Sequence, residues 1–215
     1  MVAISPESRD TRVDVRFLRD DGYFSDGFGR IVAGAVPPLL PTLVGALVVA
    51  TLVVAGLGQL SGITLFAPAV ALLLSGAASG HPHDGRFDWM IPPVLRGTEY
   101  LYLLALGHGS DVPAPLVFVL LAVVALHHCD AVRRTRCGVR PPVWTMRARL
   151  GWDGRMLLIA LGGVLGWLPF AYGALAGYLV VLLVWETWTS WLATPITAVA
   201  DVPRNEQGGV DASTT

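Results

Sequence analysis

The stretch from Gly80 to Tyr100, GHPHDGRFDWMIPPVLRGTEY, gathers the residue types that could do chemistry. Asp84 and Asp88 are four residues apart, so on a helix both carboxylates project from one face. Two carboxylates at this spacing suit Mg²⁺, which keeps several waters and takes one or two protein oxygens beside substrate phosphate. We therefore expect Asp84 and Asp88 to hold Mg²⁺, Arg86 to face phosphate and His83 to transfer a proton. The alternative is that both aspartates only solvate a polar loop.

Arg96 and Glu99 lie further along the same stretch, inside an apolar run. A lone charge inside a membrane span costs roughly 2.5–3.5 kcal/mol on insertion scales, so such residues usually face a polar cavity and find partners. Their spacing of three allows them to pair on one helix face. We expect them to shape the floor of a pocket, and the alternative is a structural ion pair that locks helices together. Glu186 is a second acidic residue in an apolar run, near a water interface or buried.

Two further groups of ionisable residues follow in the chain. One runs from His127 to Arg134, and the other consists of Asp153 and Arg155. His127, His128, Cys129 and Asp130 are consecutive, but neighbouring helical side chains point about 100° apart, so one tetrahedral zinc ion could not bind all four. We expect His127, as the alternative to His83, to transfer a proton, and His127 and Asp130 to share a helix face with Arg133 or Arg134. The predicted substrate-binding residues of all three groups are Arg86, Arg96, Glu99, Asp130, Arg133, Arg134, Asp153 and Arg155.

The elements that must position these residues are apolar. The chain has 215 residues, of which 53% are hydrophobic and 14% are charged, whereas a soluble domain is about a quarter charged. A transmembrane helix needs roughly 20 mainly apolar residues. The apolar segments span residues 31–57, 60–78, 91–106, 112–127, 156–170 and 174–192. We expect an all-α integral membrane bundle of about six transmembrane helices.

The distribution of arginine predicts the orientation of this bundle. All 15 basic residues are arginine, and those outside the spans lie before the first span, between the second and third, between the fourth and fifth, and after the sixth. Cytoplasmic loops collect positive charge. Both termini are therefore expected in the cytoplasm, with the bundle in the inner membrane and the ionisable groups together at its cytoplasmic face. On the opposite face only His108 and Asp111 stand out.

The chain divides into a cytoplasmic or interfacial leader at residues 1–30, a transmembrane domain at 31–195 and a disordered cytoplasmic tail at 196–215. The leader either lies on the inner leaflet as an amphipathic piece or is flexible. The net charge is −1 and the basic residues are spread over loops, which argues against a nucleic-acid partner. The sequence leaves a homo-oligomer open.

One motif resembles a known signature. Gly80-x3-Asp84-x3-Asp88 is similar to the second half of the CDP-alcohol phosphotransferase pattern, which reads DGxxAR followed by GxxxDxxxD. The resemblance implies that the aspartates bind a divalent metal, that Asp88 acts as general base on the acceptor hydroxyl, and that the core has six membrane helices. The first half of the signature is missing, because FAPAVALLLSG stands in its place, and the similar Asp26 to Arg30 is one residue short and lies much earlier.

A broader pattern covers about residues 12 to 195. HPHDGRFDW, PPVLRGTEY, HHCDAVRR and GWDGRM together resemble an uncharacterised actinobacterial membrane domain that is often joined to CDP-alcohol phosphotransferase and nucleotidyltransferase-like modules. The resemblance implies work on, or beside, nucleotide-activated alcohols or lipids.

These observations favour a Mg²⁺-dependent membrane enzyme, a transferase or lyase, acting on a diphosphate-activated alcohol or lipid. The first alternative is a membrane prenyl-diphosphate enzyme, although the aspartate-rich motifs of UbiA-like prenyltransferases and terpene synthases do not occur; a proton-initiated cyclase would use Glu99 or Glu186 as its acid. The second alternative is a non-catalytic membrane partner or small transporter. A transporter would have a central cavity lined by Arg96, Glu99 and Glu186.

Overall fold

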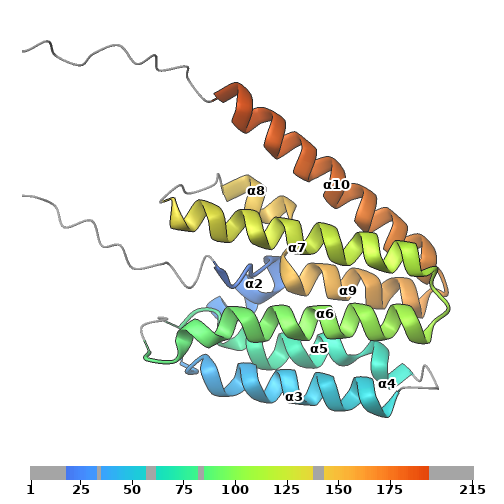
Figure 1. The fold of residues 1–215 in the computed structure, drawn as a ribbon. Coiled ribbons are helices and arrows are strands. Elements are labelled where there is room, and N and C mark those ends of the chain that lie inside the picture. The colour runs from blue at the N-terminus through green and yellow to red at the C-terminus, as the bar shows by residue number, and fades with distance from the viewer. Residues whose placement is uncertain (1–17, 33–34, 57–61, 82–84, 138–142, 194–215) are drawn as a thin grey trace, which may run out of the picture.

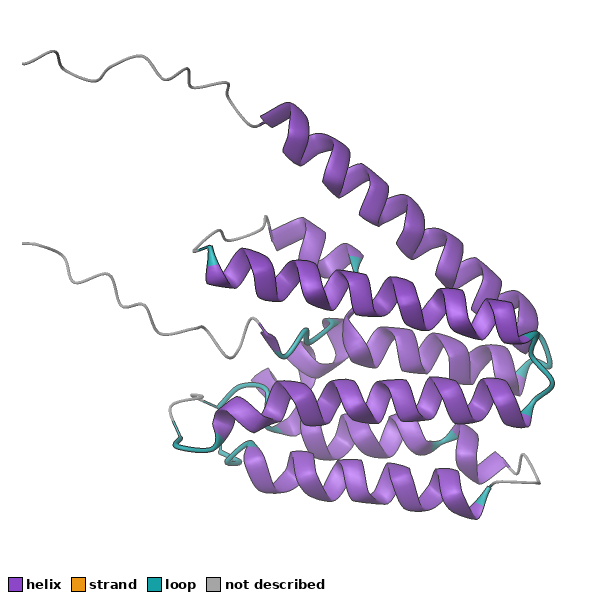
Figure 2. Ribbon diagram, viewed as in Figure 1, coloured by secondary structure: helices purple, strands orange, loops and turns teal. Residues whose placement is uncertain are grey.

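The described part of the fold is built from helices. The computed structural model describes residues 18–32, 35–56, 62–81, 85–137 and 143–193, and every regular element within these ranges is a helix (Figure 2). This confirms the predicted all-α class. The tail at 196–215 lies outside the described residues, as do most of the leader and the predicted site residues His83 and Asp84.

The helices follow one another along the chain with short connections. In order they are α2 (Tyr23–Ile31), α3 (Leu39–Ala55), α4 (Gly62–Leu65), α5 (Ala67–Ala71), the π-helical turn η1 (Leu72–Gly76), the 3-10 turn η2 (Asp88–Met90), α6 (Ile91–Gly109), α7 (Ala114–Arg136), α8 (Val143–Ala148), α9 (Gly151–Val164) and α10 (Leu168–Ala193). Figure 1 shows the long helices side by side, and α10 leans away from the others toward its C-terminal end.

Each predicted apolar segment contains helix, with boundaries set by local chemistry. Pro38 stands at the N-cap of α3, because proline is tolerated at a helix start and not in its interior. The second segment is divided into α4, α5 and η1, with Pro68 in the first turn of α5. α7 continues past residue 127 to Arg136, with arginines in its last turn, where positive charge stabilises the helix C-terminus.

Among the described residues, two helices are long and apolar enough to cross a membrane by length and composition: α7 and the part of α10 from Leu168 to Thr189. The outer faces of the long helices also carry large exposed apolar side chains. They include Leu47 on α3, Leu104 on α6, Phe118 on α7, Leu161 on α9 and Val181 on α10. Exposed apolar surface of this extent is typical of a protein that contacts lipid or other proteins.

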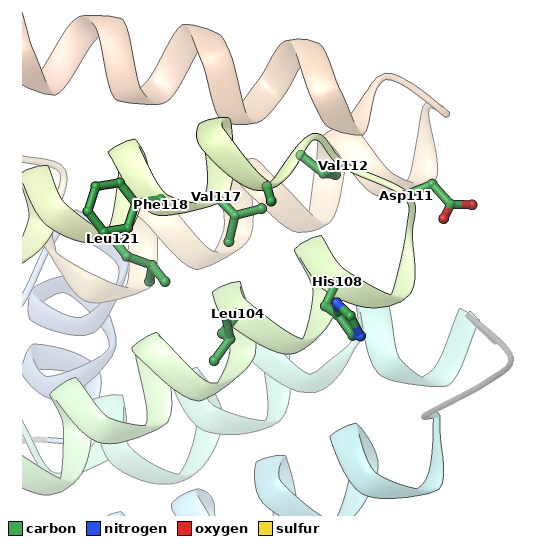
Figure 3. A pocket seen from close by; sticks show the side chains of 8 residues that line it. Leu104, His108, Asp111, Val112, Val117, Phe118 and Leu121 are labelled. Atoms are coloured by element: carbon green, nitrogen blue, oxygen red, sulfur yellow. The ribbon is translucent and has the colours of Figure 1, made fainter.

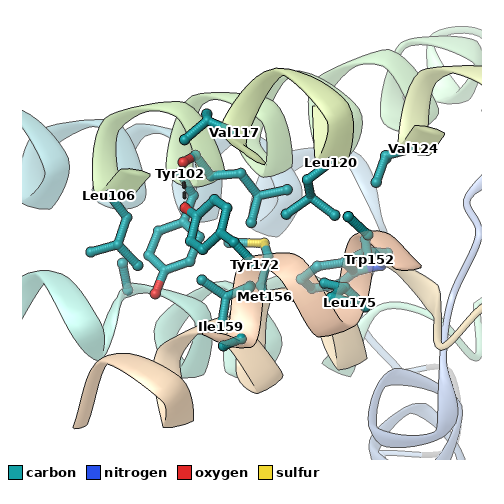
Figure 4. Close-up of a cluster of buried hydrophobic side chains, with 14 of the residues drawn as sticks. Tyr102, Leu106, Val117, Leu120, Val124, Trp152, Met156, Ile159, Tyr172 and Leu175 are labelled. Atoms are coloured by element: carbon teal, nitrogen blue, oxygen red, sulfur yellow. Dashed lines mark hydrogen bonds between the residues drawn. The ribbon is translucent and has the colours of Figure 1, made fainter. Parts of the chain in front are cut away.

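The core lies between α6, α7, α9 and α10 and continues to α3 and α5. Figure 4 shows Tyr102, Leu120, Met156 and Tyr172 packed against one another there, and all four side chains are fully buried. The hydroxyl of Tyr172 donates to the carbonyl of Leu103 at 2.6 Å, so its polar atom is satisfied inside the apolar layer.

The chain passes back and forth between two ends of the molecule, because α3, α6 and α9 run one way and the α4–α5–η1 segment, α7 and α10 run the other (Figure 1). We call the end that holds α2, the start of α6, the C-terminal turns of α7, α8 and the start of α9 the charged end. We call the end with the α6–α7 and α9–α10 turns the apolar end. Most of the residues that the sequence singled out are at the charged end.

Candidate functional site

Arg155, in the first turns of α9, is the centre of the charged end and is 1% exposed. Its Nε donates to Glu99 Oε1 at 2.5 Å and its Nη2 to Glu99 Oε2 at 3.0 Å. Nη2 also donates to Asp20 Oδ2 at 2.7 Å, and Nη1 to the carbonyl of Arg149 at 3.0 Å. A bidentate pair of this kind is among the strongest side-chain interactions in proteins. Arg155 therefore has a partner for each of its nitrogen atoms.

His128 and Tyr100 extend the same group. His128 Nε2 lies 3.4 Å from Asp20 Oδ2, and the Tyr100 hydroxyl lies 2.7 Å from His128 Nδ1. His127, the predicted proton-transfer residue, turns the other way on α7, and its Nε2 lies 3.0 Å from the carbonyl of Leu179 on α10. Consecutive helical side chains diverge by about 100°, so only one of the two histidines reaches the carboxylates.

Arg149, just before α9, forms a second group of ion pairs. It is 4% exposed, donates to both carboxylate oxygens of Glu186, and lies 3.1 Å from Asp130 Oδ2. Asp130 also accepts from Arg133 at 2.7 Å and Arg134 at 2.6 Å. The expectation that Asp130 shares a helix face with Arg133 or Arg134 is thus confirmed, whereas His127 lies against Leu179 instead. Glu186 is buried, so the alternative that it lies near a water interface is wrong.

The two groups are joined through the Arg149 carbonyl, and we call them together the buried ion network: Arg155, Glu99, Asp20, His128, Tyr100, Arg149, Glu186 and Asp130. In a low-dielectric interior, removing one member of such a pair leaves an uncompensated charge, which is strongly unfavourable. Each arginine of the network already faces carboxylates. The network is therefore closed on itself.

Asp153 belongs to a neighbouring contact and holds the N-terminal segment. Its Oδ1 accepts from the backbone nitrogen of Gly22 at 2.8 Å, and its Oδ2 accepts from the backbone nitrogen of Ser25 at 2.7 Å. These are nitrogens at the start of α2, which have no partner inside the helix and favour a negative charge. The sequence predicted that Asp153 binds substrate; in the structure it caps α2.

Further contacts hold the segment from Leu18 to α2 against the bundle. Trp152 Nε1 donates to Asp21 Oδ1 at 2.9 Å, and Asp21 Oδ2 lies 2.8 Å from Arg19 Nε. Arg96 does not pair with Glu99; its Nη2 donates to the carbonyl of Leu18 at 3.0 Å. Both residues predicted for a pocket floor thus hold parts of the protein itself together.

The two neighbouring aspartates of this segment have opposite pKa shifts. Burial raises the pKa of Asp20, but the charges and hydrogen bonds of Arg155 and His128 outweigh it and leave the pKa lowered. For Asp21, burial dominates over Arg19 and Trp152, so the pKa of its carboxyl is raised. Asp20 is therefore held ionised inside the network.

The predicted metal site is described only in part. Asp88 is buried and its Oδ2 accepts from the backbone nitrogen of Gly85 at 2.9 Å. Arg86 is exposed, with its guanidinium carbon 5.6 Å from the centre of the Phe87 ring. Within the part of the chain that the structure describes, no group of three or more His, Cys, Asp or Glu side chains could hold a metal ion.

The structure thus joins Glu99, Asp130, Arg134 and Arg155 of the predicted site into one region, with Arg133 at its exposed edge. Sequence reasoning missed Asp20, Tyr100 and Arg149, and it noted His128 without giving it a role. Asp20 contacts Arg155 from 135 positions away in the chain, so no local spacing pattern could reveal it. The charge inside apolar runs was the only available signal, and it pointed to Glu99 and Glu186.

No curated protein and no solved structure matches the chain. One family model matches it over residues 11–207, and its description is "Family of unknown function (DUF5941)". The match covers the whole helical bundle, including the N-terminal segment that carries Asp20. The chain therefore belongs to this family of unknown function, DUF5941.

Proposed function

We propose that this chain is a non-catalytic, multi-pass membrane domain that docks a partner protein at its charged end. The charged end lies at the cytoplasmic face, where it also holds the chain's own N-terminal segment. The observation that carries this proposal is the closed buried ion network. A phosphate-binding site needs unpaired donors and a metal site needs unpaired oxygens. Arg155 and Arg149 instead donate to Glu99, Asp20, Glu186 and Asp130, and the same carboxylates hold the helices together.

Embedding in the membrane is supported by the distribution of exposed side chains. The spans of this proposal are α3, the α4–α5–η1 segment, α6, α7, α9 and α10, with both termini in the cytoplasm at the inner membrane. Exposed tryptophans occur near both ends, Trp89 and Trp144 at the charged end and Trp167 at the apolar end. Tryptophan is enriched at both membrane–water interfaces.

The exposed surface of the charged end suits an acidic partner. Arg30, Arg86, Arg133, Arg136 and Arg147 are exposed there, and the Arg147 guanidinium lies 5.7 Å from the Tyr23 ring centre. Arginine and aromatic side chains are enriched in protein interfaces. The resemblance to a domain that is joined to CDP-alcohol phosphotransferase and nucleotidyltransferase-like modules suggests the partner, an enzyme that acts on nucleotide-activated alcohols or lipids.

The two cysteines provide the test of orientation. Cys129 and Cys137 are free, exposed and at the charged end. A membrane-impermeant maleimide should label them in inverted membrane vesicles and not in intact cells, whereas a cysteine introduced by Asp111→Cys in a variant lacking both should show the reverse. Labelling of Cys129 and Cys137 from outside the cell would overturn the orientation.

A second candidate is the Mg²⁺-dependent enzyme for a diphosphate-activated alcohol or lipid, and one observation favours it. Asp88 Oδ1 makes no hydrogen bond to any described residue, and the exposed Arg86 lies two positions away. Together with Asp84 in the sequence, these residues offer carboxylate oxygens for a metal ion and a guanidinium for a phosphate. His83 would be its proton-transfer group.

One experiment separates the two candidates. The purified chain is incubated with Mg²⁺ and either CDP-alcohols or prenyl diphosphates, and products are measured by mass spectrometry. We expect no turnover. Turnover that Asp88→Asn abolishes and that Asp26→Asn, an exposed control on α2, leaves intact would establish the enzyme and overturn the non-catalytic proposal. The Asp88→Asn variant should stay folded, because the asparagine side chain retains an oxygen that can accept from the backbone nitrogen of Gly85.

A further inference from the structure

A hollow of about 460 Å³ lies between α6 and α7 at the apolar end (Figure 3). Apolar side chains form most of its lining, and they come from facing turns of the two helices. The apolar lining residues used below are Leu104, Ala114, Val117 and Phe118. Leu104 is 52% exposed and Phe118 is 72% exposed, so the hollow opens on the outer side of the helix pair. Its volume lies in the range of about 300–1,000 Å³ that is usual for small-molecule sites.

Both polar side chains that the sequence singled out at this end line the same hollow. Among the described residues of the apolar end, His108 and Asp111 are the only exposed ionisable ones. In Figure 3 the His108 ring extends from the last turns of α6, and the Asp111 carboxylate points outward beyond the end of the helix pair. The arrangement is amphipathic, with an apolar interior and a negative charge beyond its end.

We propose that this hollow binds a membrane lipid whose hydrocarbon chain lies between α6 and α7 and whose head group carries an ammonium that pairs with Asp111. Hydrocarbon gains contact with Leu104, Val117 and Phe118, and an ammonium donates to a carboxylate. The inference lies outside the proposed function of the charged end but rests on the membrane embedding proposed with it.

The charge at this end selects among lipid head groups. No arginine or lysine occurs in the described turns between α6 and α7 or between α9 and α10, so a purely anionic head group would meet Asp111 without a compensating cation. Like charges repel and opposite charges attract across short distances. A zwitterionic head group with a terminal ammonium is therefore favoured over an anionic one.

The experiment uses the full chain in bilayer discs with traces of two photoreactive lipids that share the same diazirine-labelled acyl chain. One lipid has an ethanolamine head group and the other a glycerol head group. After illumination, mass spectrometry maps the labelled peptides. We expect the ethanolamine lipid to label the peptides around Leu104 and Phe118 about threefold more than the glycerol lipid, because only the ethanolamine head group carries an ammonium that can pair with Asp111.

Two variants make the test specific. Ala114→Phe fills the hollow and should remove the extra labelling, whereas Val119→Phe, an exposed position on the same helix outside the hollow, should keep it. Asp111→Asn should equalise the two lipids, and asparagine tolerates the left-handed backbone there (φ 54°). Equal labelling by both lipids in the parent chain, or equal behaviour of the two phenylalanine variants, overturns the proposal. Labelling of the outer faces of α3 and α10 reports the membrane embedding independently.

Discussion

The two ends of the bundle differ in what surrounds their polar residues. At the charged end, Arg155, Glu99 and Arg149 are almost fully buried and bind one another or Asp20 and Glu186. At the apolar end, His108 and Asp111 are exposed and stand beside a hollow. One end has many charges that are already paired, and the other has few polar groups next to open volume.

The difference shows that density of charge alone is a poor guide to a ligand site. Buried charges attract each other strongly, so a dense set of them is stable only when it pairs internally. A binding site needs space and polar groups that are free to reach a ligand. The charged end is therefore best tested as a structural clamp and the apolar end as a binding site.

The largest expected effect comes from breaking the clamp at its centre. Arg155→Met removes the cation between the buried Glu99 and the partly buried Asp20 and leaves both carboxylates without it. Losing one partner of a buried pair costs about 3–5 kcal/mol, so thermal unfolding of the purified protein in detergent should shift to a much lower temperature. Arg147→Met, at an exposed position of the same end, should change stability by about 0.5 kcal/mol or less.

A compensating substitution sharpens this result. Combining Arg155→Met with Glu99→Gln and Asp20→Asn removes the uncompensated charges and should recover a large part of the lost stability. If Arg155→Met unfolds at the temperature of the parent, the network does not act as a clamp.

The second prediction concerns the fit of α2 against the bundle. A Cβ at Gly29 would overlap the Ser79 hydroxyl and lie 2.7 Å from the backbone nitrogen of Gly80, whereas a Cβ at Gly27 would meet nothing within 4 Å. Gly29→Ala should therefore lower the free energy of unfolding by about 1–3 kcal/mol through overpacking. Gly27→Ala should raise it by roughly 0.5–1 kcal/mol, because alanine favours the helix.

Limited proteolysis would locate the effect of these substitutions. In the Gly29→Ala variant, cleavage should become faster in the segment before α3 and stay unchanged in the α6–α7 turn. Equal cleavage patterns for the alanine variants of Gly27 and Gly29 would contradict the close packing of α2 on Ser79.

The fold was predictable from the sequence because its signal is local. Apolar runs that are long enough for helices mark each long helix, and α6 begins at the predicted residue 91. The breaks inside the second segment and the extension of α7 depend on proline position and on charges in the last turn, which shift boundaries without changing the helix. The six membrane crossings and their orientation stay predictions.

The candidate site was predictable only in part, because its partners are distant in sequence. Spacing correctly joined Asp130 to Arg133 and Arg134, which are three and four residues away on α7. Spacing also suggested an Arg96–Glu99 pair, but tertiary contacts with Leu18 and Arg155 compete more effectively for these side chains. Local patterns reveal which residues are charged and not which residue will neutralise them.

The third prediction is a dependence of stability on pH through Asp20. The pKa of Asp20 is lowered in the folded protein by Arg155 and His128, despite burial. A lowered pKa gives stability that is present above the unfolded value, near 3.8, and is lost as the pH falls toward the folded value. Between about pH 6 and about pH 3, the free energy of unfolding of Asp20→Asn should therefore fall by about 1 kcal/mol less than that of the parent. Melting temperatures measured across this range should fall less steeply for the variant.

Asp20→Asn is a suitable variant because asparagine tolerates the left-handed backbone of this position, where φ is 57°. At neutral pH the variant should be less stable than the parent, since it weakens the contacts with Arg155 and His128. Parallel pH profiles for parent and variant would show that other carboxyl groups cause the acid sensitivity.

The smallest expected effect on stability belongs to the apolar end. Asp111 is exposed, and its carboxylate has no ion pair or hydrogen bond within the described residues. Asp111→Asn should therefore change the free energy of unfolding by no more than about 0.5 kcal/mol, measured by the same thermal unfolding in detergent. The same substitution should remove the head-group preference of the hollow, because an amide carries no charge to attract an ammonium. Asp111 is thus expected to contribute to lipid selection and not to stability, whereas Asp20 is expected to contribute to stability. A large loss of stability on Asp111→Asn would contradict this difference between the two ends.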